Sequence, residues 1–431
     1  MVLTGRVGLL AALGAPVVLV AARPGLALAG VATVLALLVV VDVLAAGSTR
    51  PLAFSRSGPE MVRLGETVTV DLLAQNRGRR RVRGVLRDAW PPSAGAEPGR
   101  HRVDVGKGRQ QHVKVQLTPT RRGTREPAAV TVRSLGPLRL AGRQGAHRVP
   151  WSLRVVPPFL SRKHLPAKLS RLRELEGQTP SLVRGQGTEF DSLREYVIGD
   201  DVRSIDWRAT ARRRDVVVRT WRPERDRRVL VVLDSGRTSA GRVGRWPRLD
   251  WSMDAALLLA ALASHAGDRV DLLAYDRAVR AWAPAVPKTQ LLSSLVNVMA
   301  PIEAELVESD FTGMVSAVLT RATRRCLVVL LTDLNATTMH EGLLPVLPRL
   351  AGTHQVLLAA VSDPQVAVMA GGRGTAEQVY DAAAAERQRQ ERRRLTAHLR
   401  RHQVDVVDAV PDDLAAALAD AYLALKAAGR L

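Results

Sequence analysis

The sequence predicts a multi-domain protein with an N-terminal transmembrane helical hairpin, a β-sandwich and an α/β doubly wound domain. Three observations lead to this fold class. Two apolar runs fill residues 1–50, short alternating segments fill residues 51–160, and apolar strands alternate with helices over residues 229–431. Residues 161–228 form a separate segment with a dense polar pattern. The length of 431 residues permits several domains, and a composition of 46% apolar and 24% charged residues excludes a disordered chain.

The first 50 residues contain the predicted membrane anchor. The apolar runs Val7–Ala22 and Gly25–Ala46 are separated by a short Arg-Pro turn. About 20 apolar residues cross a bilayer, so the second run is long enough and the first is slightly short. Arg50 and further arginines follow, so the positive-inside rule predicts a cell-membrane protein with two spans and most of the chain in the cytoplasm. A signal peptide is the alternative for the first run. Asp42, near the end of the second run, is expected to be hydrated.

Residues 51–160 are predicted to form the β-sandwich, and they also carry most of the charge. The net charge of the chain is +22, of which residues 51–160 contribute +14, residues 161–230 contribute +6 and residues 231–431 contribute none. The basic run that includes Arg79, Arg80 and Arg81 lies at a predicted hairpin. It suits either contact with anionic lipid headgroups or a solvated turn. Only 3% of the chain is aromatic, so the stacking platforms of single-stranded nucleic-acid binders are missing and no nucleic-acid partner is expected.

Residues 185–212 have the densest polar pattern in the chain. Gly199-Asp200-Asp201 is typical of a turn, and residues 202–211 are predicted to form a short helix capped by Asp201. Arg203 and Asp206 are three positions apart, so they are expected to be neighbours on that helix. Mixed arginines and carboxylates of this kind suit ion pairing that fixes an irregular connection. The residues predicted to serve structure or docking are Glu189, Phe190, Arg194, Tyr196, Gly199, Asp200, Asp201, Arg203, Asp206, Trp207 and Arg208.

The same segment resembles the signature of domain-of-unknown-function family 58. The pattern that begins at Gly185 reads Gly-x-Gly-x-Glu-Phe, then Leu-Arg-Glu-Tyr-x-x-Gly-Asp-Asp-x-Arg-x-Ile-Asp-Trp-Arg-x-x-Ala-Arg, and the resemblance extends to about Asp234. It implies two N-terminal membrane spans, a β-rich region and a C-terminal von Willebrand factor A-like domain. Members are often encoded beside AAA+ ATPases of the MoxR type, which implies a shared pathway.

Residues 229–431 alternate between predicted strands and helices. Val229–Asp234 is a continuous apolar strand of the kind buried in a parallel sheet. The segments that follow are helix 251–265, strand 268–275, helices 288–299 and 312–322, strands 326–332, 354–361 and 404–407, and helix 412–427. Ligands of such sheets bind beyond the carboxyl ends of the strands. We therefore expect a site at Asp234 and at Thr332-Asp333.

The resemblance also implies a degenerate metal site at these strand ends. Domains of the von Willebrand factor A type bind a metal ion through Asp-x-Ser-x-Ser, a Thr on a second loop and an Asp after a later strand. Here the first loop reads Asp-Ser-Gly-Arg-Thr, so Gly236 supplies no side-chain oxygen. The implied cofactor is Mg²⁺, which prefers octahedral oxygen coordination. Alternatively, the two aspartates pair with arginines or cap helices. The candidate ligands are Asp234, Thr238, Thr312 and Asp333.

Two further features of the last 200 residues deserve a prediction. The run Glu386–Arg401 contains seven basic residues and is predicted to be an exposed helical face and a candidate docking surface. The single cysteine, Cys326, leads an apolar strand and is expected in the core. One cysteine excludes an internal disulfide and a cysteine-based zinc site.

The sequence contains no complete catalytic set, so the leading hypothesis is a membrane-anchored, non-enzymatic scaffold. Its von Willebrand factor A-like domain would dock protein partners, and the resemblance implies a MoxR-type AAA+ ATPase among them. Membrane lipid is the other expected partner. The alternative is a membrane-bound, metal-dependent hydrolase that uses Asp200, Asp201 and Asp206 as ligands or as acid and base.

Overall fold

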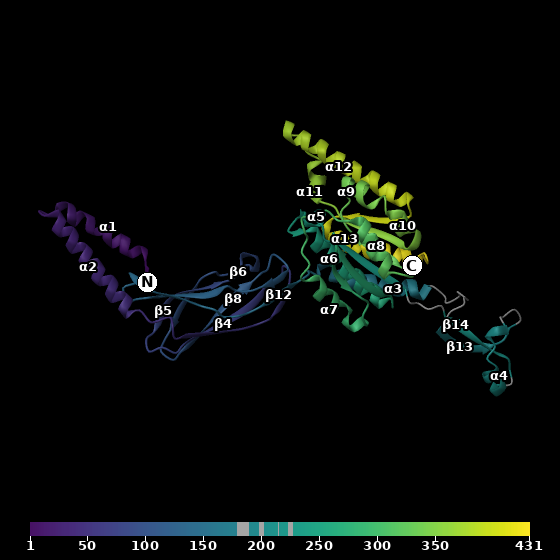
Figure 1. Ribbon diagram of the computed structural model, residues 1–431, viewed down its shortest axis with the longest axis horizontal. Helices are drawn as coiled ribbons and strands as arrows, with labels where there is room; N and C mark the ends of the chain where they lie inside the picture. The colour runs from purple at the N-terminus through teal and green to yellow at the C-terminus, as the bar shows by residue number, and fades with distance from the viewer. Residues whose placement is uncertain (179–188, 198–201, 214, 223–226) are drawn as a thin grey trace. The chain divides into compact units, whose positions relative to one another are not determined.

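The protein divides into two compact units, Met1–Pro157 and Pro158–Leu431. The computed structural model describes residues 1–178, 189–197, 202–213, 215–222 and 227–431. The first unit contains two apolar helices and three sheets, and the second contains a six-stranded sheet with helices (Figure 1). The predicted multi-domain, β-rich character with an N-terminal apolar helix is therefore confirmed.

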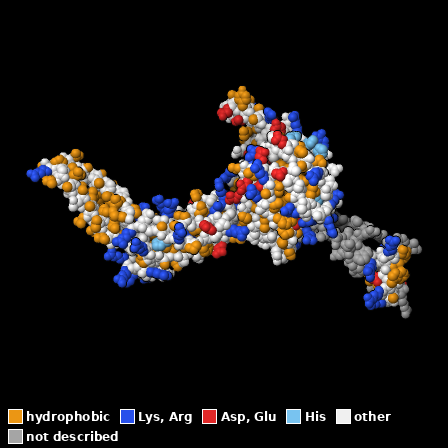
Figure 2. Space-filling model, in the orientation of Figure 1, with side chains coloured by type: hydrophobic (Ala, Val, Ile, Leu, Met, Phe, Trp, Pro, Cys, Tyr) orange, Lys and Arg blue, Asp and Glu red, His pale blue; other side chains and the backbone are white. Residues whose placement is uncertain are grey.

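The first unit begins with a short strand and two helices in contact: β1 (Val2–Leu3), α1 (Gly5–Val20) and α2 (Pro24–Ala45). Helix α2 has 22 residues and is long and apolar enough to cross a membrane, whereas α1 is apolar but has only 16. Hydrophobic side chains cover the outer surface of both helices (Figure 2). In the part of the chain that the structure describes, α2 is the one helix that satisfies both the length and the hydropathy of a membrane span.

The end of α2 is bound to the β-rich part of the same unit, and the expectation that Asp42 is hydrated is wrong. Asp42 is fully buried. Its carboxylate accepts hydrogen bonds from the backbone N–H groups of Leu138 at 2.8 Å, Leu140 at 2.7 Å and Ala141 at 2.8 Å. Gly136 lies so close that a Cβ there would overlap this carboxylate. Three donors from one loop satisfy the charge that water was expected to solvate.

Basic side chains and the first strand strengthen this attachment. The Arg80 guanidinium donates to the carbonyl of Leu44, and Nε of Arg143 donates to the carbonyl of Val43 at 3.1 Å. Both contacts place positive charge at the C-terminal end of α2, where the helix dipole favours it. Strand β1 pairs with β11 (Ala141–His147), so the start of α1 and the end of α2 are bound to the same edge of the unit.

The remaining strands of the first unit form three sheets. Their orders are β1-β11-β10-β5-β7, β2-β4-β8-β6 and β3-β12-β9. Burial alternates along β4 and β8, as expected when each sheet has one face in the core and one in solvent. The bounds are β2 (Leu52–Ser57), β3 (Met61–Arg63), β4 (Val68–Asn76), β5 (Val82–Ala89), η1 (Pro92–Ala94), β6 (Ala96–Glu97), β7 (His101–Val105), β8 (Gln110–Leu117), β9 (Gly123–Arg125), β10 (Ala129–Leu135) and β12 (Leu153–Val156).

The second unit begins with η2 (Leu160–His164) and α3 (Leu165–Gln178), followed by the signature segment. Strand β13 (Glu189–Glu195) pairs antiparallel with β14 (Val217–Arg222). Between them lie the short 3-10 helix η3 (Val202–Ser204) and helix α4 (Trp207–Arg213). The predicted single helix over residues 202–211 is therefore wrong, because Ile205 forms a β-bridge with Val218 that interrupts it.

The main sheet of the second unit has the order β19-β18-β15-β20-β21-β22. Every neighbouring pair is parallel except β18 and β19, which are antiparallel. Counted from one along the chain, this is the order 3-2-1-4-5-6 of a doubly wound sheet. The strands are β15 (Arg228–Asp234), β18 (Arg269–Tyr275), β19 (Val279–Ala283), β20 (Leu327–Leu331), β21 (Gln355–Val361) and β22 (Val404–Ala409).

Helices cover both faces of this sheet. Helices α6 and α13 contact the sheet strands from one side, and α6 is buried over nearly its whole length. On the other face, α8, α10 and the C-terminal half of α12 form one apolar core with alternate residues of the strands. The bounds are α5 (Arg237–Ala240), β16 (Arg242–Val243), β17 (Trp246–Pro247), α6 (Arg248–His265), α7 (Lys288–Met299), α8 (Phe311–Arg321), α9 (Ala336–Thr338), η4 (Met339–Leu343), α10 (Leu347–Thr353), α11 (Pro364–Met369), α12 (Ala376–Arg401) and α13 (Pro411–Ala427).

Candidate functional site at the carboxyl edge of the main sheet

The Asp234 cluster, made of Asp234, Gly236, Ser309 and Thr332, lies where β15 and β20 end. Asp234 is 1% exposed. One carboxylate oxygen accepts from the Ser309 hydroxyl at 2.5 Å and from the Gly236 N–H at 2.9 Å, and the other accepts from the Thr332 hydroxyl at 2.6 Å. Neutral donors thus occupy both carboxylate oxygens.

Burial raises the pKa of Asp234 above its ordinary value, and the charge of nearby Asp276 adds to this, while the three donors oppose it. Asp276 behaves differently although it is also buried. Burial alone would raise its pKa, but the Arg280 guanidinium and the backbone N–H groups of Arg277 and Ala278 outweigh burial and lower it. Among the described residues, Asp276 has a cationic partner that Asp234 lacks, and this contributes to the opposite directions of their pKa shifts.

The four candidate metal ligands do not converge through hydrogen bonds. The partners of Asp234 are Gly236, Ser309 and Thr332, and neither Thr238 nor Thr312 is among them. Thr312 is exposed on α8, and Thr238 is half-buried on α5. A Cβ at Gly236 would overlap the Ser309 hydroxyl, so Ser309 fills the space where the Asp-x-Ser-x-Ser motif has its first serine side chain.

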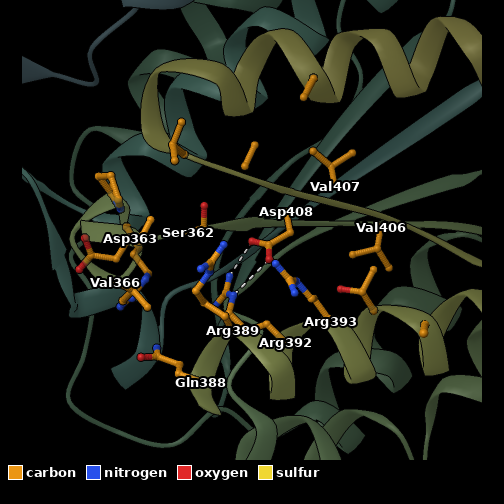
Figure 3. Close-up of a pocket in the computed structure, with 18 of the residues that line it drawn as sticks. Ser362, Asp363, Val366, Gln388, Arg389, Arg392, Arg393, Val406, Val407 and Asp408 are labelled. Atoms are coloured by element: carbon orange, nitrogen blue, oxygen red, sulfur yellow. Dashed lines mark hydrogen bonds and ion pairs between the residues drawn. The ribbon is translucent and has the colours of Figure 1, made fainter. Parts of the chain in front are cut away.

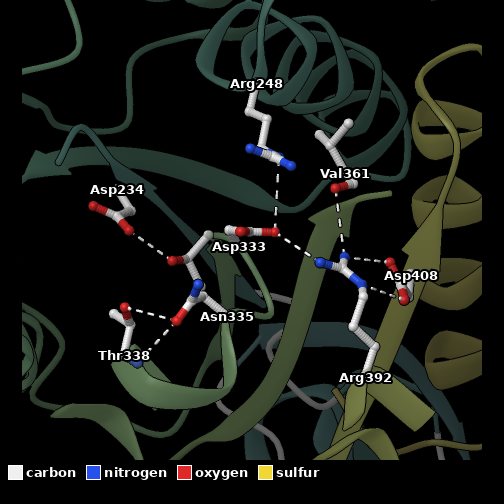
Figure 4. Close-up of polar contacts among 9 residues, drawn as sticks. Asp234, Arg248, Asp333, Asn335, Thr338, Val361, Arg392 and Asp408 are labelled. Carbon is white, nitrogen blue, oxygen red and sulfur yellow. Dashed lines mark hydrogen bonds and ion pairs between the residues drawn. The ribbon is translucent and has the colours of Figure 1, made fainter. Parts of the chain in front are cut away.

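Asp333 belongs to a second group, the Arg392 network of Arg248, Asp333, Arg392 and Asp408 (Figure 4). Arg392 donates to Asp333 at 2.9 Å and forms a two-pronged pair with Asp408 at 2.7 and 3.2 Å. Nε of Arg248 lies 3.7 Å from the same Asp333 oxygen. Burial opposes the charge of Arg392, but its two carboxylate partners outweigh burial and raise its pKa.

These contacts do not fit the Mg²⁺ site that the family resemblance implies. Such a site needs oxygen ligands in near-octahedral geometry around the ion. Asp333 is already neutralised by guanidinium groups, and among the described residues no group of three or more His, Cys, Asp or Glu side chains is placed to hold a metal. The arginine pairing that the sequence left open as the alternative is the arrangement found for Asp333.

A cavity of about 950 Å³ lies beside the Arg392 network, where β21 and β22 end (Figure 3). We call it the arginine pocket. It is bounded by α12, by the segment that starts α11, and by the ends of the two strands. Five arginines line it against two aspartates: Arg248, Arg389, Arg392, Arg393 and Arg400, with Asp363 and Asp408. Asp363 accepts from the N–H of Gln365 and caps α11, so its charge is partly used within the chain.

The signature residues that the structure describes lie in or between β13 and β14. Asp206 accepts from the N–H groups of Arg208 and Ala209, each at 3.0 Å, and pairs with Arg219 on β14 at 2.8 Å. The Ala209 N–H and the Arg219 charge lower its pKa. Asp206 therefore caps α4 and forms an ion pair with Arg219, which lies on β14.

Other signature positions are less informative. Tyr196 donates its backbone N–H to the carbonyl of Val216 at 2.8 Å, and Arg194 bonds the carbonyl of Glu195 at 3.1 Å. Trp207 is 69% exposed, which is unusual for so large an apolar side chain. Glu189 and Phe190 lie in β13. Gly199, Asp200 and Asp201 lie outside the described residues, so the hydrolase alternative stays a prediction.

Sequence reasoning did not identify Ser309 or Arg248 as site residues, and it did not predict that Arg392 pairs with both Asp333 and Asp408. Ser309 lies 75 positions from Asp234, and no spacing rule connects them. Arg392 was part of the basic run predicted to be exposed. Its position on the face of α12 that also carries the buried Leu395 and Leu399 was the available signal, since residues three and seven positions on share a helix face.

Comparison with solved structures gives matches of low TM-score. The CARDB domain of a Pyrococcus furiosus protein matches with a TM-score of 0.19 and 16% identity, covering 24% of this chain and 87% of that chain. The alkylpurine DNA glycosylase AlkC of Pseudomonas fluorescens matches with a TM-score of 0.15 and 16% identity, covering 31% of this chain and 42% of that chain. At such TM-scores neither supports a fold or a function.

Sequence relatives are more informative. Proteins described as uncharacterized in Mycobacterium tuberculosis and Mycobacterium bovis are 28% identical over 193 residues. The match covers 44% of this chain and 60% of each relative. It is therefore a partial match on both sides. Residues 192–405 match the family described as Protein of unknown function DUF58. This match supports the family resemblance inferred from the signature segment.

Proposed function

We propose that this protein is a membrane-anchored, non-enzymatic scaffold that docks protein partners through its C-terminal α/β domain. The observation that carries the proposal is the carboxyl edge of the main sheet. There Asp234 is bound by hydroxyl and backbone donors and Asp333 by arginines, while a wide arginine pocket opens beside them. Such an edge suits recognition of a charged partner better than proton transfer, which needs a titratable group free to reach a substrate.

The docking domain is, in this proposal, of the von Willebrand factor A type. Support comes from the strand order and from β19, the antiparallel edge strand next to β18. Further support comes from the loop Asp234-Ser235-Gly236-Arg237-Thr238 directly after the first strand of the sheet. The partner proposed from the family resemblance is a MoxR-type AAA+ ATPase. Because Asp333 is paired with Arg392, docking is expected to need no Mg²⁺ bound at this edge.

The anchor is proposed to be a hairpin of two spans with most of the chain in the cytoplasm. Support comes from β1 and the end of α2, which meet at the same edge of the first unit, so that a chain leaving through α1 returns through α2. Helix α1 extends about 24 Å at 1.5 Å per residue, somewhat less than the hydrocarbon core. The arginines at the end of α2 are proposed to contact anionic lipid, each adding about 1 kcal/mol of attraction.

Co-purification tests this proposal. The full chain, in detergent, would be immobilised and incubated with the MoxR-type ATPase encoded by the same genome, with and without Mg²⁺. We expect retention of the ATPase in both conditions, since hydroxyl donors bind Asp234 and Arg392 binds Asp333. If retention of nucleotide-free ATPase required Mg²⁺ and was lost in Asp234→Ala, the result would instead support a metal ion bound at Asp234. Failure to retain the ATPase in either condition would sink the proposed partnership.

A further inference from the structure

The arginines that line the arginine pocket outnumber the aspartates that line it. Arg392 and Arg248 face Asp333 and Asp408, so these two cations and two carboxylates offset one another. Arg389 pairs at 3.0 Å with Glu386, three positions before it on α12, and the two side chains are 38% and 54% exposed. Screening by solvent makes such a surface pair weak, so Arg389 can exchange its partner at little cost.

Two arginines of the pocket have no carboxylate partner among the described residues. Arg393 is exposed, and no hydrogen bond or ion pair to another described side chain involves it. Arg400 has one long hydrogen bond, 3.5 Å, to the carbonyl of Val406. Guanidinium groups favour planar, two-pronged bonds with carboxylate or phosphate. The pocket therefore offers two such groups that the chain itself leaves available, besides Arg389.

The spacing of these arginines suits an elongated ligand. Arg389, Arg393 and Arg400 follow one another on α12 at intervals of four and seven residues, which places them on one face. At 1.5 Å per residue they extend over about 16 Å of the helix axis. An extended peptide rises about 3.3 Å per residue with alternate side chains on one side, so about five residues cover that length. A single phosphate would reach only one end of the row.

The side chains between the arginines also suit a peptide. Gln388 and Thr396 line the same wall and can bond a peptide backbone, while Val366, Val406 and Val407 give apolar contacts nearby. Figure 3 shows Arg389, Arg392 and Arg393 directed from α12 toward the end of β22. In the lining there is no aromatic side chain on which a nucleobase would stack.

We infer that the arginine pocket binds an extended acidic segment of a partner protein, with carboxylates on Arg389, Arg393 and Arg400. This inference rests on the proposed docking function and names the site and the chemistry that the partner presents. Attraction of this kind acts largely on association and falls with ionic strength. The Arg392 network forms the floor of the site and holds α12 against the sheet, while the three other arginines meet the ligand.

Fluorescence anisotropy with a synthetic peptide tests the site. The probe is a labelled peptide of alternating Glu and Ser, titrated with the full chain in detergent at low and high salt. The double variant Arg393→Glu/Arg400→Glu reverses the two unpartnered charges. We expect it to weaken binding by about tenfold or more, because each reversed charge removes an attraction and adds a repulsion.

The matched control is Arg394→Glu/Arg401→Glu, which makes the same change in net charge on the same helix. Arg394 and Arg401 are exposed and do not line the pocket. Binding by the control is expected to change less than about twofold, since distant exposed charges are screened. Equal losses in both double variants would overturn the inference, because a general charge effect would then explain the binding. The urea midpoint of both variants shows that each is folded.

Further probes separate the competing ligands. A peptide with Gln in place of Glu should bind much more weakly, and equal binding would overturn the role of carboxylates. Competition by inorganic phosphate or by a single-stranded oligonucleotide at concentrations below that of the acidic peptide would overturn the choice of partner. If the peptide binds but the ATPase is not retained, the proposed partnership fails and the site stands. If the ATPase is retained equally by wild type and Arg393→Glu/Arg400→Glu, docking uses another surface and this inference fails.

Discussion

Along the carboxyl edge of the main sheet, the ends of the central strands β15 and β20 and the ends of β21 and β22 stabilise buried charge in opposite ways. Where β15 and β20 end, Asp234 is surrounded by two hydroxyls and one N–H, and burial raises its pKa. Where β21 and β22 end, arginines outnumber the carboxylates and a cavity of about 950 Å³ opens. The first end is closed by neutral donors, and the second is open and cationic. A general rule for doubly wound sheets points to the first end, whereas the local charge points to the second.

The largest expected effect comes from removing the guanidinium group of Arg392, which pairs with both Asp333 and Asp408. Arg392→Met leaves Asp333 and Asp408, whose side chains are 9% and 25% exposed, without their main partner. Removing one member of a buried ion pair typically costs about 3 kcal/mol or more of the free energy of unfolding. Urea unfolding of the full chain in detergent, followed by tryptophan fluorescence, measures this loss.

The control for Arg392 is Arg387 on the same helix, whose side chain is 81% exposed and pairs with Glu391. Arg387→Met is expected to change the free energy of unfolding by less than about 0.5 kcal/mol, as for other solvated pairs. Similar losses in both variants would mean that the Arg392 network contributes no more than a surface pair. The Asp234 cluster and the Arg392 network would then differ in the presence of a cavity and not in how buried charge is stabilised.

Asp42 extends the comparison to the first unit, because it is a buried carboxylate with neutral donors only. Asp42→Ala leaves the N–H groups of Leu138, Leu140 and Ala141 without their acceptor. Water can reach part of this loop, so we expect a loss of about 2 kcal/mol. Thermal unfolding in detergent, read from the β-sheet signal in circular dichroism, measures it. Asp104→Ala is the control, since Asp104 is 40% exposed in its pair with Arg81. A control loss as large as that of Asp42→Ala would refute the anchoring role.

A smaller effect is expected at the closed end of the main sheet. Thr332→Val keeps the volume of the side chain and removes one hydroxyl donor to Asp234. A single lost hydrogen bond to a buried carboxylate costs about 1–2 kcal/mol. Thr312→Val is the control, because Thr312 is exposed and is not a partner of Asp234. Urea unfolding of both variants, side by side, would detect the difference. A larger loss for Thr312→Val would instead support the ligand set implied by the family resemblance.

The elements of the main sheet could be predicted from the sequence because their signal is local. The apolar strand before Asp234 and helix α7 were predicted to within one residue, since burial on both faces leaves an unbroken apolar run and an amphipathic helix leaves a repeat. Cys326 is buried, as expected. Strand β19 was missed because only one of its edges is paired and its residues are partly exposed.

The contacts of the site could not be predicted from the sequence, because they join distant positions. Asp42 and its donors are 96 to 99 residues apart, and Arg392 and Asp333 are 59 apart. Spacing rules work within one helix or one loop, where geometry is fixed by the backbone. The sequence placed Asp234 and Asp333 at the correct edge of the sheet, but only the tertiary structure separates them into two groups with different partners.

The smallest expected effect is a change in the pH dependence of stability. Because burial raises the pKa of Asp234 above its ordinary value of 3.8, the folded protein holds this proton at a pH where the unfolded chain has lost it. The stability due to this group is complete below about pH 4 and is lost as the pH rises through the higher folded pKa. Asp234→Asn cannot titrate. The free energy of unfolding of the wild type, minus that of Asp234→Asn, should therefore decrease as the pH rises from about 4 to about 7. Urea unfolding of both proteins across this range measures the difference. A difference that stays constant would show that the three donors keep Asp234 charged throughout, and the closed end would then hold a full negative charge that a cation could neutralise.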